Sequence, residues 1–217
     1  MPVKPTIIRL IMKLRQKGIT DRNVLAAIER IPRELFVPTS FYDQAYEDIA
    51  LPIGNGQTIS QPTVVAFMTQ KLEPDIKSKV LEIGTGCGYQ AAVLSRLFRR
   101  VYTIERYRNL LRAAEKRFIK LRLNNIIPLW ADGNQGWPDQ APFDRIILTA
   151  GTPSVPNVLF EQLSENGILI APVGYTSANQ KLVLYKKNGQ NISAEKLWAV
   201  RFVPVVSGTV SDTVSSN

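Results

Sequence analysis

The chain has 217 residues and a formal net charge of +9, with 45% hydrophobic and 21% charged residues. This length and composition fit one soluble domain with its own core, and no apolar run approaches the roughly 18 residues that a membrane span needs. The sequence contains no histidine and a single cysteine, Cys87. These counts exclude an internal disulfide, a Ser-His-Asp triad, a Cys-His pair and almost every catalytic zinc site. We therefore expect a cytoplasmic protein without membrane attachment or bound metal.

Residues 1–78 have the pattern of a helical extension packed on a core domain. Apolar residues recur at helical spacing, Thr20 and Asp21 are candidate N-caps, and Pro62 suits the first turn of a helix. Prolines and glycines interrupt the segment between the second and third helix, so we expect loops with short helical turns there. The predicted helices cover 4–17, 20–31 and 62–72, and the loop-rich segment covers 32–57.

From residue 79 onward, apolar strands alternate with amphipathic helices, which predicts an α/β fold with a doubly wound, mostly parallel sheet. The predicted strands are 79–84, 100–105, 126–131, 143–149 and 167–173, and the predicted helices are 88–98, 107–123 and 155–164. Two further strand-like runs flank Asn188-Gly189, which predicts a hairpin and therefore an antiparallel edge at the C-terminal end of the sheet. The core domain is predicted to cover 79–208, and the small polar residues 209–217 to form a disordered tail.

The run VLEIGTGCGYQ, residues 80–90, carries glycines at alternate positions, Gly84, Gly86 and Gly88. An apolar strand that breaks into such a turn before a helix is the usual place for a nucleotide-like ligand. A dinucleotide site would place its third glycine three residues after the second, and no P-loop Lys-Ser/Thr pair follows. A nucleoside without phosphates fits better, and S-adenosylmethionine is the common one.

Acidic residues lie at the strand positions where such a ligand needs acceptors. Glu105 ends the strand that follows the glycine motif and can accept hydrogen bonds from both ribose hydroxyls, although it could also be a solvated strand end. Glu82, within the preceding strand, could face the ammonium of the cofactor or be a structural buried acid. Asp132 and Gly133 follow the third strand as a common turn-forming pair.

Six blocks then occur in order: GQTISQPTVVAFM (56–68), VLEIGTGCGYQAAVL (80–94), VYTIER (101–106), APFDRIILTA (141–150), NGILIAPVG (166–174) and RFVPVVSG (201–208). Together they closely resemble the protein-L-isoaspartate O-methyltransferase family, from about Pro32 to Gly208. The resemblance implies a Rossmann-like fold that binds S-adenosylmethionine. It also implies transfer of a methyl group to the free carboxylate of isoaspartyl residues in damaged proteins and peptides, which initiates repair because the ester collapses unaided to a succinimide.

The resemblance also implies the roles of individual residues. Ser60 is at the position of the family's active-site serine, and Asp132 is at the position that contacts the adenine amino group. An isoaspartyl carboxylate is already ionised at neutral pH, so we expect Ser60 to orient it, although Ser60 could instead cap the helix at Pro62. The predicted substrate residues are Thr58, Ile59, Gln61, Arg201 and Val205, of which Arg201 could equally be an ordinary strand-face charge. The predicted cofactor residues are Glu82, Gly84, Thr85, Gly86, Gly88, Glu105, Arg106, Asp132 and Gly133.

Four positions depart from the family pattern. Cys87 stands where serine is common, and we expect it to be a small space-filling residue. Thr63 and Asn134 stand where aromatic residues occur, and Gly151 where alanine is usual. We expect these three departures to affect substrate preference more than cofactor binding.

Two other functions remain open at this point. The +9 charge fits a methyltransferase that acts on RNA, which would need Trp130 or Trp137 to face the cofactor. A cofactor-binding module that has lost catalysis and acts as an interaction partner is the other, but Ser60, Glu105 and Asp132 are all present. Our expectation is a monomeric enzyme with isoaspartyl proteins and peptides as its partners, and without a nucleic-acid partner.

Overall fold

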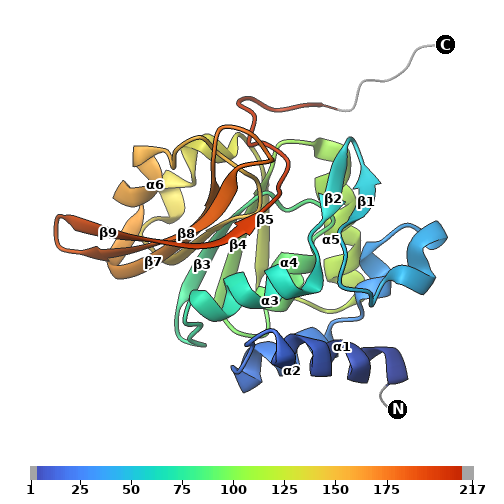
Figure 1. Cartoon of the computed structure of the whole chain (residues 1–217). Coiled ribbons are helices and arrows are strands. Elements are labelled where there is room, and N and C mark those ends of the chain that lie inside the picture. The colour runs from blue at the N-terminus through green and yellow to red at the C-terminus, as the bar shows by residue number, and fades with distance from the viewer. Residues whose placement is uncertain (1–3, 212–217) are drawn as a thin grey trace.

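The computed structural model describes residues 4–211, in which strands and helices alternate (Figure 1). The strands are β1 (Leu51–Gly54), β2 (Gln57–Ile59), β3 (Lys79–Ile83), β4 (Arg100–Glu105), β5 (Ile126–Trp130), β6 (Phe143–Leu148), β7 (Leu163–Val173), β8 (Gln180–Asn188) and β9 (Asn191–Val200). The α-helices are α1 (Pro5–Gln16), α2 (Arg22–Arg30), α3 (Pro62–Lys71), α4 (Tyr89–Leu94), α5 (Arg108–Lys120) and α6 (Asn157–Glu161). The short 3-10 helices are η1 (Arg33–Phe36), η2 (Thr39–Gln44), η3 (Gly133–Gln135) and η4 (Pro138–Gln140).

Within the described range, seven strands form one sheet in the order β5-β4-β3-β6-β7-β8-β9, and β1 and β2 form a separate hairpin. Neighbours from β5 to β7 pair in parallel, whereas β8 and β9 pair antiparallel. The predicted doubly wound sheet with an antiparallel C-terminal edge is therefore confirmed. No helix between residues 4 and 211 combines the length and the apolar character that crossing a membrane requires.

The sheet separates two hydrophobic clusters, because successive residues of a strand point to opposite faces. In β3, Val80 belongs to a cluster with residues of α1, α2, α3 and α4, whereas Leu81 belongs to a cluster with Leu159 of α6. Leu14 of α1 and Val24 of α2 are fully buried in the first cluster. The N-terminal helices thus share one core with the sheet. Figure 1 shows α1 and α2 next to α3.

Several local signals act as predicted. The carboxylate of Asp21 caps α2 by accepting hydrogen bonds from the amides of Asn23 and Val24 at 2.8 and 3.1 Å. Pro62 begins α3. The β8–β9 turn contains Gly189 with a φ of +60°, which suits glycine.

Other elements differ from the prediction. The segment expected to be loop-rich contains the β1–β2 hairpin, whose turn residues Asn55 and Gly56 have φ of +52° and +66°. Helix α6 covers only 157–161, because β7 already begins at Leu163, which pairs with Phe143 of β6. Helix α4 ends at Leu94 rather than at residue 98.

The start of the predicted tail is bound to the core. The amide of Val210 donates to the carbonyl of Arg106 at 2.7 Å, and its carbonyl accepts from the amide of Arg108 at 3.1 Å. The prediction of disorder is therefore wrong at residue 210, where a parallel bridge to Tyr107 replaces it. Residues 212–217 of the predicted tail lie outside the described residues.

Candidate active site

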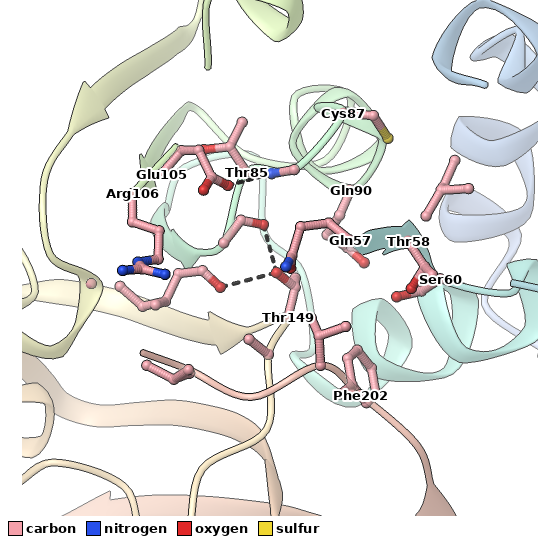
Figure 2. A pocket seen from close by; sticks show the side chains of 18 of the residues that line it. Gln57, Thr58, Ser60, Thr85, Cys87, Gln90, Glu105, Arg106, Thr149 and Phe202 are labelled. Atoms are coloured by element: carbon pink, nitrogen blue, oxygen red, sulfur yellow. Dashed lines mark hydrogen bonds between the residues drawn. The ribbon is translucent and has the colours of Figure 1, made fainter. Parts of the chain in front are cut away.

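A cavity of about 240 Å³ lies at the carboxyl ends of β3 and β4. Strand β3 lies between β4 and β6, so the strand order reverses at β3. At such a reversal the connections that follow the strands run to opposite sides, which leaves a crevice at the carboxyl ends of the strands. Figure 2 shows Glu105 and Arg106 at one end of the cavity, Thr58 and Ser60 at the other, and Thr149 and Phe202 along the edge between them.

The glycine loop has the left-handed backbone that the sequence motif requires. Gly84, Gly86 and Gly88 have φ of +100°, +54° and +90°. A Cβ on Gly84 would lie 2.4 Å from the hydroxyl of Thr149, and one on Gly88 would lie 2.7 Å from the ring of Phe118 in α5. Gly84 and Gly86 line the cavity, whereas Gly88 allows the loop to pack against α5.

Glu105 is buried and lines the same cavity. Its Oε2 accepts a hydrogen bond from the amide of Gly86 at 2.8 Å, and its Oε1 accepts one from the amide of Tyr107 at 2.9 Å. Burial raises the pKa of the Glu105 carboxyl above its ordinary value, against the opposing effect of these amides. Since each oxygen has a second lone pair, the carboxylate can still accept hydrogen bonds from a ligand.

Glu82 lies behind the cavity wall and does not line it. Its carboxyl is fully buried and accepts a hydrogen bond from the Thr103 hydroxyl at 2.5 Å. The Thr103 hydroxyl is in turn 2.6 Å from that of Thr85, which does line the cavity. Burial raises the pKa of Glu82 to about 8. Glu82 therefore reaches the cavity only through two threonine hydroxyls.

Gly133 lines the cavity, but Asp132 does not. The Asp132 carboxylate accepts hydrogen bonds from the amide of Gly208 at 2.7 Å and from the amide of Asn134 at 2.9 Å. These bonds outweigh the effect of burial and lower the pKa of Asp132. The residue whose implied role is adenine binding is thus bound to the C-terminal segment.

A second cavity, of about 460 Å³, adjoins the first. Residues on both walls at the junction are shared by the two cavities, namely Thr58, Ser60, Val64, Thr149, Phe202 and Val203. Of the other predicted substrate residues, Gln61 and Arg201 line the second cavity, whereas Ile59 and Val205 line the first.

Within the described residues, the hydroxyls of Ser60 and Thr58 have no hydrogen-bond partner. The N-cap of α3 is Gln61, without a side-chain capping bond. The alternative in which Ser60 caps this helix is therefore wrong. Both hydroxyls are free to donate to a group that enters from either cavity.

Arg33 of η1 holds the loop that carries Ser60. Its Nη2 donates to the Ser60 carbonyl at 2.7 Å, and its guanidinium carbon lies 4.7 Å from the centre of the Tyr89 ring. Arg33 is fully buried, and burial lowers its pKa. Its Nε and Nη1 have no hydrogen-bond partner among residues 4–211.

Of the four departures from the family pattern, Cys87 lines a cavity, whereas Thr63, Asn134 and Gly151 line neither. Thr63 lines neither cavity; its amide and hydroxyl donate to the two oxygens of Asp48 at 2.8 and 2.6 Å. Cys87 lines the first cavity as a buried thiol, and burial raises its pKa. Asn134 and Gly151 contact the side chains that hold the C-terminal segment.

Sequence reasoning missed several polar residues of the first cavity, including Gln57, Gln90, Tyr107 and Thr149. Gln90 donates to the Thr69 hydroxyl at 2.9 Å, and Thr149 donates to the carbonyls of Ile83 and Gly84 at 3.0 and 2.5 Å. Gln57, Gln90 and Thr149 lie inside the sequence blocks that resemble the family, so membership in a block was the signal that could have identified them as site residues. Within the described part of the chain, Trp130 and Trp137 line neither cavity: Trp130 donates to the Arg106 carbonyl, and Trp137 packs edge-on against Tyr102.

Residues 7–210 match the model of a family described as Protein-L-isoaspartate(D-aspartate) O-methyltransferase. A protein-L-isoaspartate O-methyltransferase of Maricaulis maris is 59% identical over 204 residues, which cover 94% of this chain and 95% of the relative. One of Parvibaculum lavamentivorans is 56% identical and covers 95% of this chain and 94% of its own length.

Solved structures agree with these matches. A structure titled protein-L-isoaspartate O-methyltransferase superposes with a TM-score of 0.85 at 31% identity, over 95% of this chain and 67% of that one. A Plasmodium falciparum structure, titled as a putative enzyme of this kind in complex with S-adenosyl-L-homocysteine, has a TM-score of 0.78 at 22% identity and covers 91% of this chain and 97% of its own, which shows the shared fold. With the family model covering nearly the whole chain and relatives above half identity, this chain belongs to the protein-L-isoaspartate O-methyltransferase family.

Proposed function

We propose that this protein transfers a methyl group from S-adenosylmethionine to the free carboxylate of L-isoaspartyl residues in damaged proteins and peptides, and so initiates their repair. The observation that carries this proposal is the pair of adjoining cavities. One contains the glycine loop and Glu105, the other contains Arg201, and the free hydroxyls of Thr58 and Ser60 lie where the two meet. Such a pair suits a donor and an acceptor that must be brought together.

The first cavity fits a nucleoside without phosphates. Glu105 supplies a buried carboxylate that can accept from two ribose hydroxyls, and the amide of Gly86 already orients it. Among the described residues that line this cavity, Arg106 is the one cation; it donates to the carbonyls of Ser207 and Gly208, so its charge is directed away from a phosphate site. We propose that Glu105, Gly84, Thr85, Gly86 and Gly133 contact the cofactor, and that Glu82, Gly88 and Asp132 support that wall from behind.

The chain's own residues then have a positioning task. The cofactor, when bound, supplies a sulfonium-activated methyl group. The isoaspartyl carboxylate is already ionised at neutral pH, so no residue has to remove a proton, in keeping with a sequence without histidine. Ser60 and Thr58 donate hydrogen bonds that orient the attacking oxygen, and Arg201 offsets its negative charge. Arg33 fixes the Ser60 carbonyl, so the hydroxyl is held at the junction.

The test uses two peptides that differ only in an aspartyl or isoaspartyl linkage, incubated with methyl-labelled S-adenosylmethionine. We expect base-labile label in the isoaspartyl peptide alone. The absence of label there, or base-stable label in added RNA, would contradict the proposal. The positions of Trp130 and Trp137 outside both cavities already weigh against a base-stacking site for RNA.

Two serine-to-alanine variants are compared to separate the role of Ser60 from a general effect of such a substitution on the protein. Ser60→Ala should retain S-adenosylhomocysteine binding, measured by calorimetry, but lower kcat about 10- to 100-fold, because one charge-assisted hydrogen bond is lost. Ser193→Ala, on exposed strand β9 and outside both cavities, is the matched control and should leave kcat unchanged. Equal kcat values for the two variants would remove Ser60 from the site.

We further propose that the enzyme acts as a cytoplasmic monomer with residues 1–78 as an integral extension of the core. Among the described residues, the most exposed large apolar side chains, those of Tyr175, Ile119 and Ile76, belong to three different segments of the chain. Light scattering of the purified protein tests the monomer directly. Loss of cooperative unfolding on deletion of α1 and α2 would support the shared core.

A further inference from the structure

Residues 201–208 include lining residues of both cavities, and we call this segment the C-terminal strap. Phe202 to Val206 line the first cavity, and Arg201 to Val203 line the second. The strap is irregular and lies outside the named strands, with a single parallel bridge from Pro204 to Gly151. Its position therefore depends on individual hydrogen bonds rather than on a strand ladder.

The first attachment is the side chain of Gln180, which is 4% exposed. Its Nε2 donates to the Phe202 carbonyl at 3.2 Å, and its Oε1 accepts from the Phe202 amide at 2.7 Å. Phe202 is part of the wall that the two cavities share. A Cβ on Gly151 would lie 2.1 Å from Gln180 Nε2, so the glycine at position 151 leaves the space that this side chain occupies.

The second attachment is at the other end of the strap. Asp132 Oδ2 accepts from the Gly208 amide at 2.7 Å, while Asn134 Nδ2 donates to Asp132 Oδ1 at 3.0 Å and to the Ser207 hydroxyl at 3.3 Å. Arg106 donates to the carbonyls of Ser207 and Gly208 from the same side. Next to this end of the strap, Val205 and Val206 line the first cavity together with Glu105 and Arg106, and neither of these valines lines the second cavity.

We propose that Gln180 and Asn134 are positioning residues that fix the two ends of the strap for different purposes. Gln180 holds the wall between cofactor and peptide, whereas Asn134, through Asp132, holds the roof of the cofactor cavity, which has to open when the cofactor exchanges. The assignment of these purposes rests on the proposed function, because it names the two cavities by their ligands. Two of the departures from the family pattern, Asn134 and Gly151, thereby lie at the two attachments of the strap.

The test compares Asn134→Ala and Gln180→Ala in three measurements. Asn134→Ala should raise the Kd for S-adenosylhomocysteine about 3- to 10-fold and leave the KM for an isoaspartyl peptide within about twofold, since the side-chain bonds to Asp132 and to the Ser207 hydroxyl are lost at the cofactor end alone. Gln180→Ala should raise the peptide KM about 5- to 30-fold, because both bonds to Phe202 are lost. Equal effects of the two variants on both constants would overturn the division of roles.

Hydrogen exchange of the protein without ligands provides a readout that is independent of catalysis. Exchange of the Gly208 amide should accelerate in Asn134→Ala, and exchange of the Phe202 amide in Gln180→Ala, each without the other. Unchanged exchange at both amides would overturn the proposal. A different outcome is that both variants show the expected acceleration of exchange but the wild-type protein does not bind S-adenosylhomocysteine. That outcome would overturn the proposed function and still support the two attachments of the strap.

A double-mutant cycle tests the link to Gly151. Gly151→Ala should raise the peptide KM when Gln180 is present, because the added Cβ displaces the Gln180 side chain. When the same substitution is made in the Gln180→Ala variant, the change in the logarithm of KM should be less than half as large. Additive effects would show that Gly151 acts independently of Gln180 and would overturn this part of the proposal.

Discussion

The sheet side of the first cavity and the side opposite it are positioned by different kinds of interaction. On the sheet side, the amides of Gly84 and Thr85 donate to the Ile104 carbonyl at 2.9 and 3.1 Å, and that of Thr149 donates to Ile83 at 2.9 Å, so parallel pairing continues into the loop. On the opposite side, Arg33 holds the Ser60 loop, and the side chain of Gln180 holds the strap together with two backbone hydrogen bonds to Gly151, at 2.8 and 2.7 Å.

This difference separates what many cofactor-binding folds share from what distinguishes this enzyme. A strand ladder fixes backbone position through many bonds and tolerates most side-chain changes, whereas a side-chain attachment is lost with one substitution. Substitutions on the sheet side should therefore be costly mainly where a glycine is needed. Those on the opposite side should change activity more than stability.

The largest expected effect is that of Gly88→Ala on the sheet side. A Cβ at φ +90° costs about 1–2 kcal/mol, and its 2.7 Å approach to Phe118 adds about 1–3 kcal/mol of overpacking. The free energy of unfolding in urea should fall by about 2–5 kcal/mol. Gly18→Ala is the matched control, with φ of +87° and open space around the added Cβ. Equal costs for the two variants would show that packing against α5 contributes nothing.

The sheet side was also the part that sequence reasoning described best. The alternate glycines and the acid at the end of the next strand follow from backbone rules that act within a few residues, so Gly84, Gly86 and Glu105 could be placed in advance. The β1–β2 hairpin was missed although Asn55-Gly56 is a strong turn signal, because the prolines and glycines around it favoured a loop. Attachments such as Arg33 to Ser60 or Gln180 to Phe202 join residues far apart in sequence, and no local pattern predicts them.

Glu82→Gln tests whether the buried carboxyl of Glu82 makes the protein less stable as pH rises. Burial raises the pKa of Glu82 from 4.5 to about 8, so between these values the folded protein keeps a proton that the unfolded chain releases. The contribution of Glu82 to stability is complete below pH 4.5 and is lost as pH rises toward 8, by up to about 1.4 kcal/mol per pH unit. Glu82→Gln should lack this decline, so its stability relative to wild type should increase from pH 5 to pH 8. Parallel pH profiles would contradict the assignment.

Arg33→Met tests the opposite side. It removes the hydrogen bond to the Ser60 carbonyl, and kcat should fall about 10- to 30-fold. The Kd for S-adenosylhomocysteine should stay within about threefold. Stability should change by less than about 2 kcal/mol, because the variant also removes a buried charge that has few partners.

Arg117→Met is the control for Arg33→Met. Arg117 also donates to backbone carbonyls, that of Leu35 in η1 at 2.8 Å and that of Cys87 in the glycine loop at 3.4 Å, but it does not contact the Ser60 loop. With S-adenosylmethionine at saturation, Arg117→Met should therefore leave kcat nearly unchanged. A loss of kcat in both variants would mean that η1, rather than the bond to Ser60, controls the active-site loop.

The smallest expected effect is that of Thr63→Val, and it is the sharpest check on how local these attachments are. The valine keeps the amide bond to Asp48 Oδ1 and loses the hydroxyl bond to Oδ2, and the half-buried Asp48 can partly replace it with water. Stability in urea should fall by about 1 kcal/mol, and Thr63→Ser should recover most of it. Peptide KM should stay within about twofold, because Thr63 lines neither cavity. A large change in KM would mean that Asp48, through Thr63, sets the position of Ser60, and the single bond from Arg33 would then not suffice to hold this side of the site.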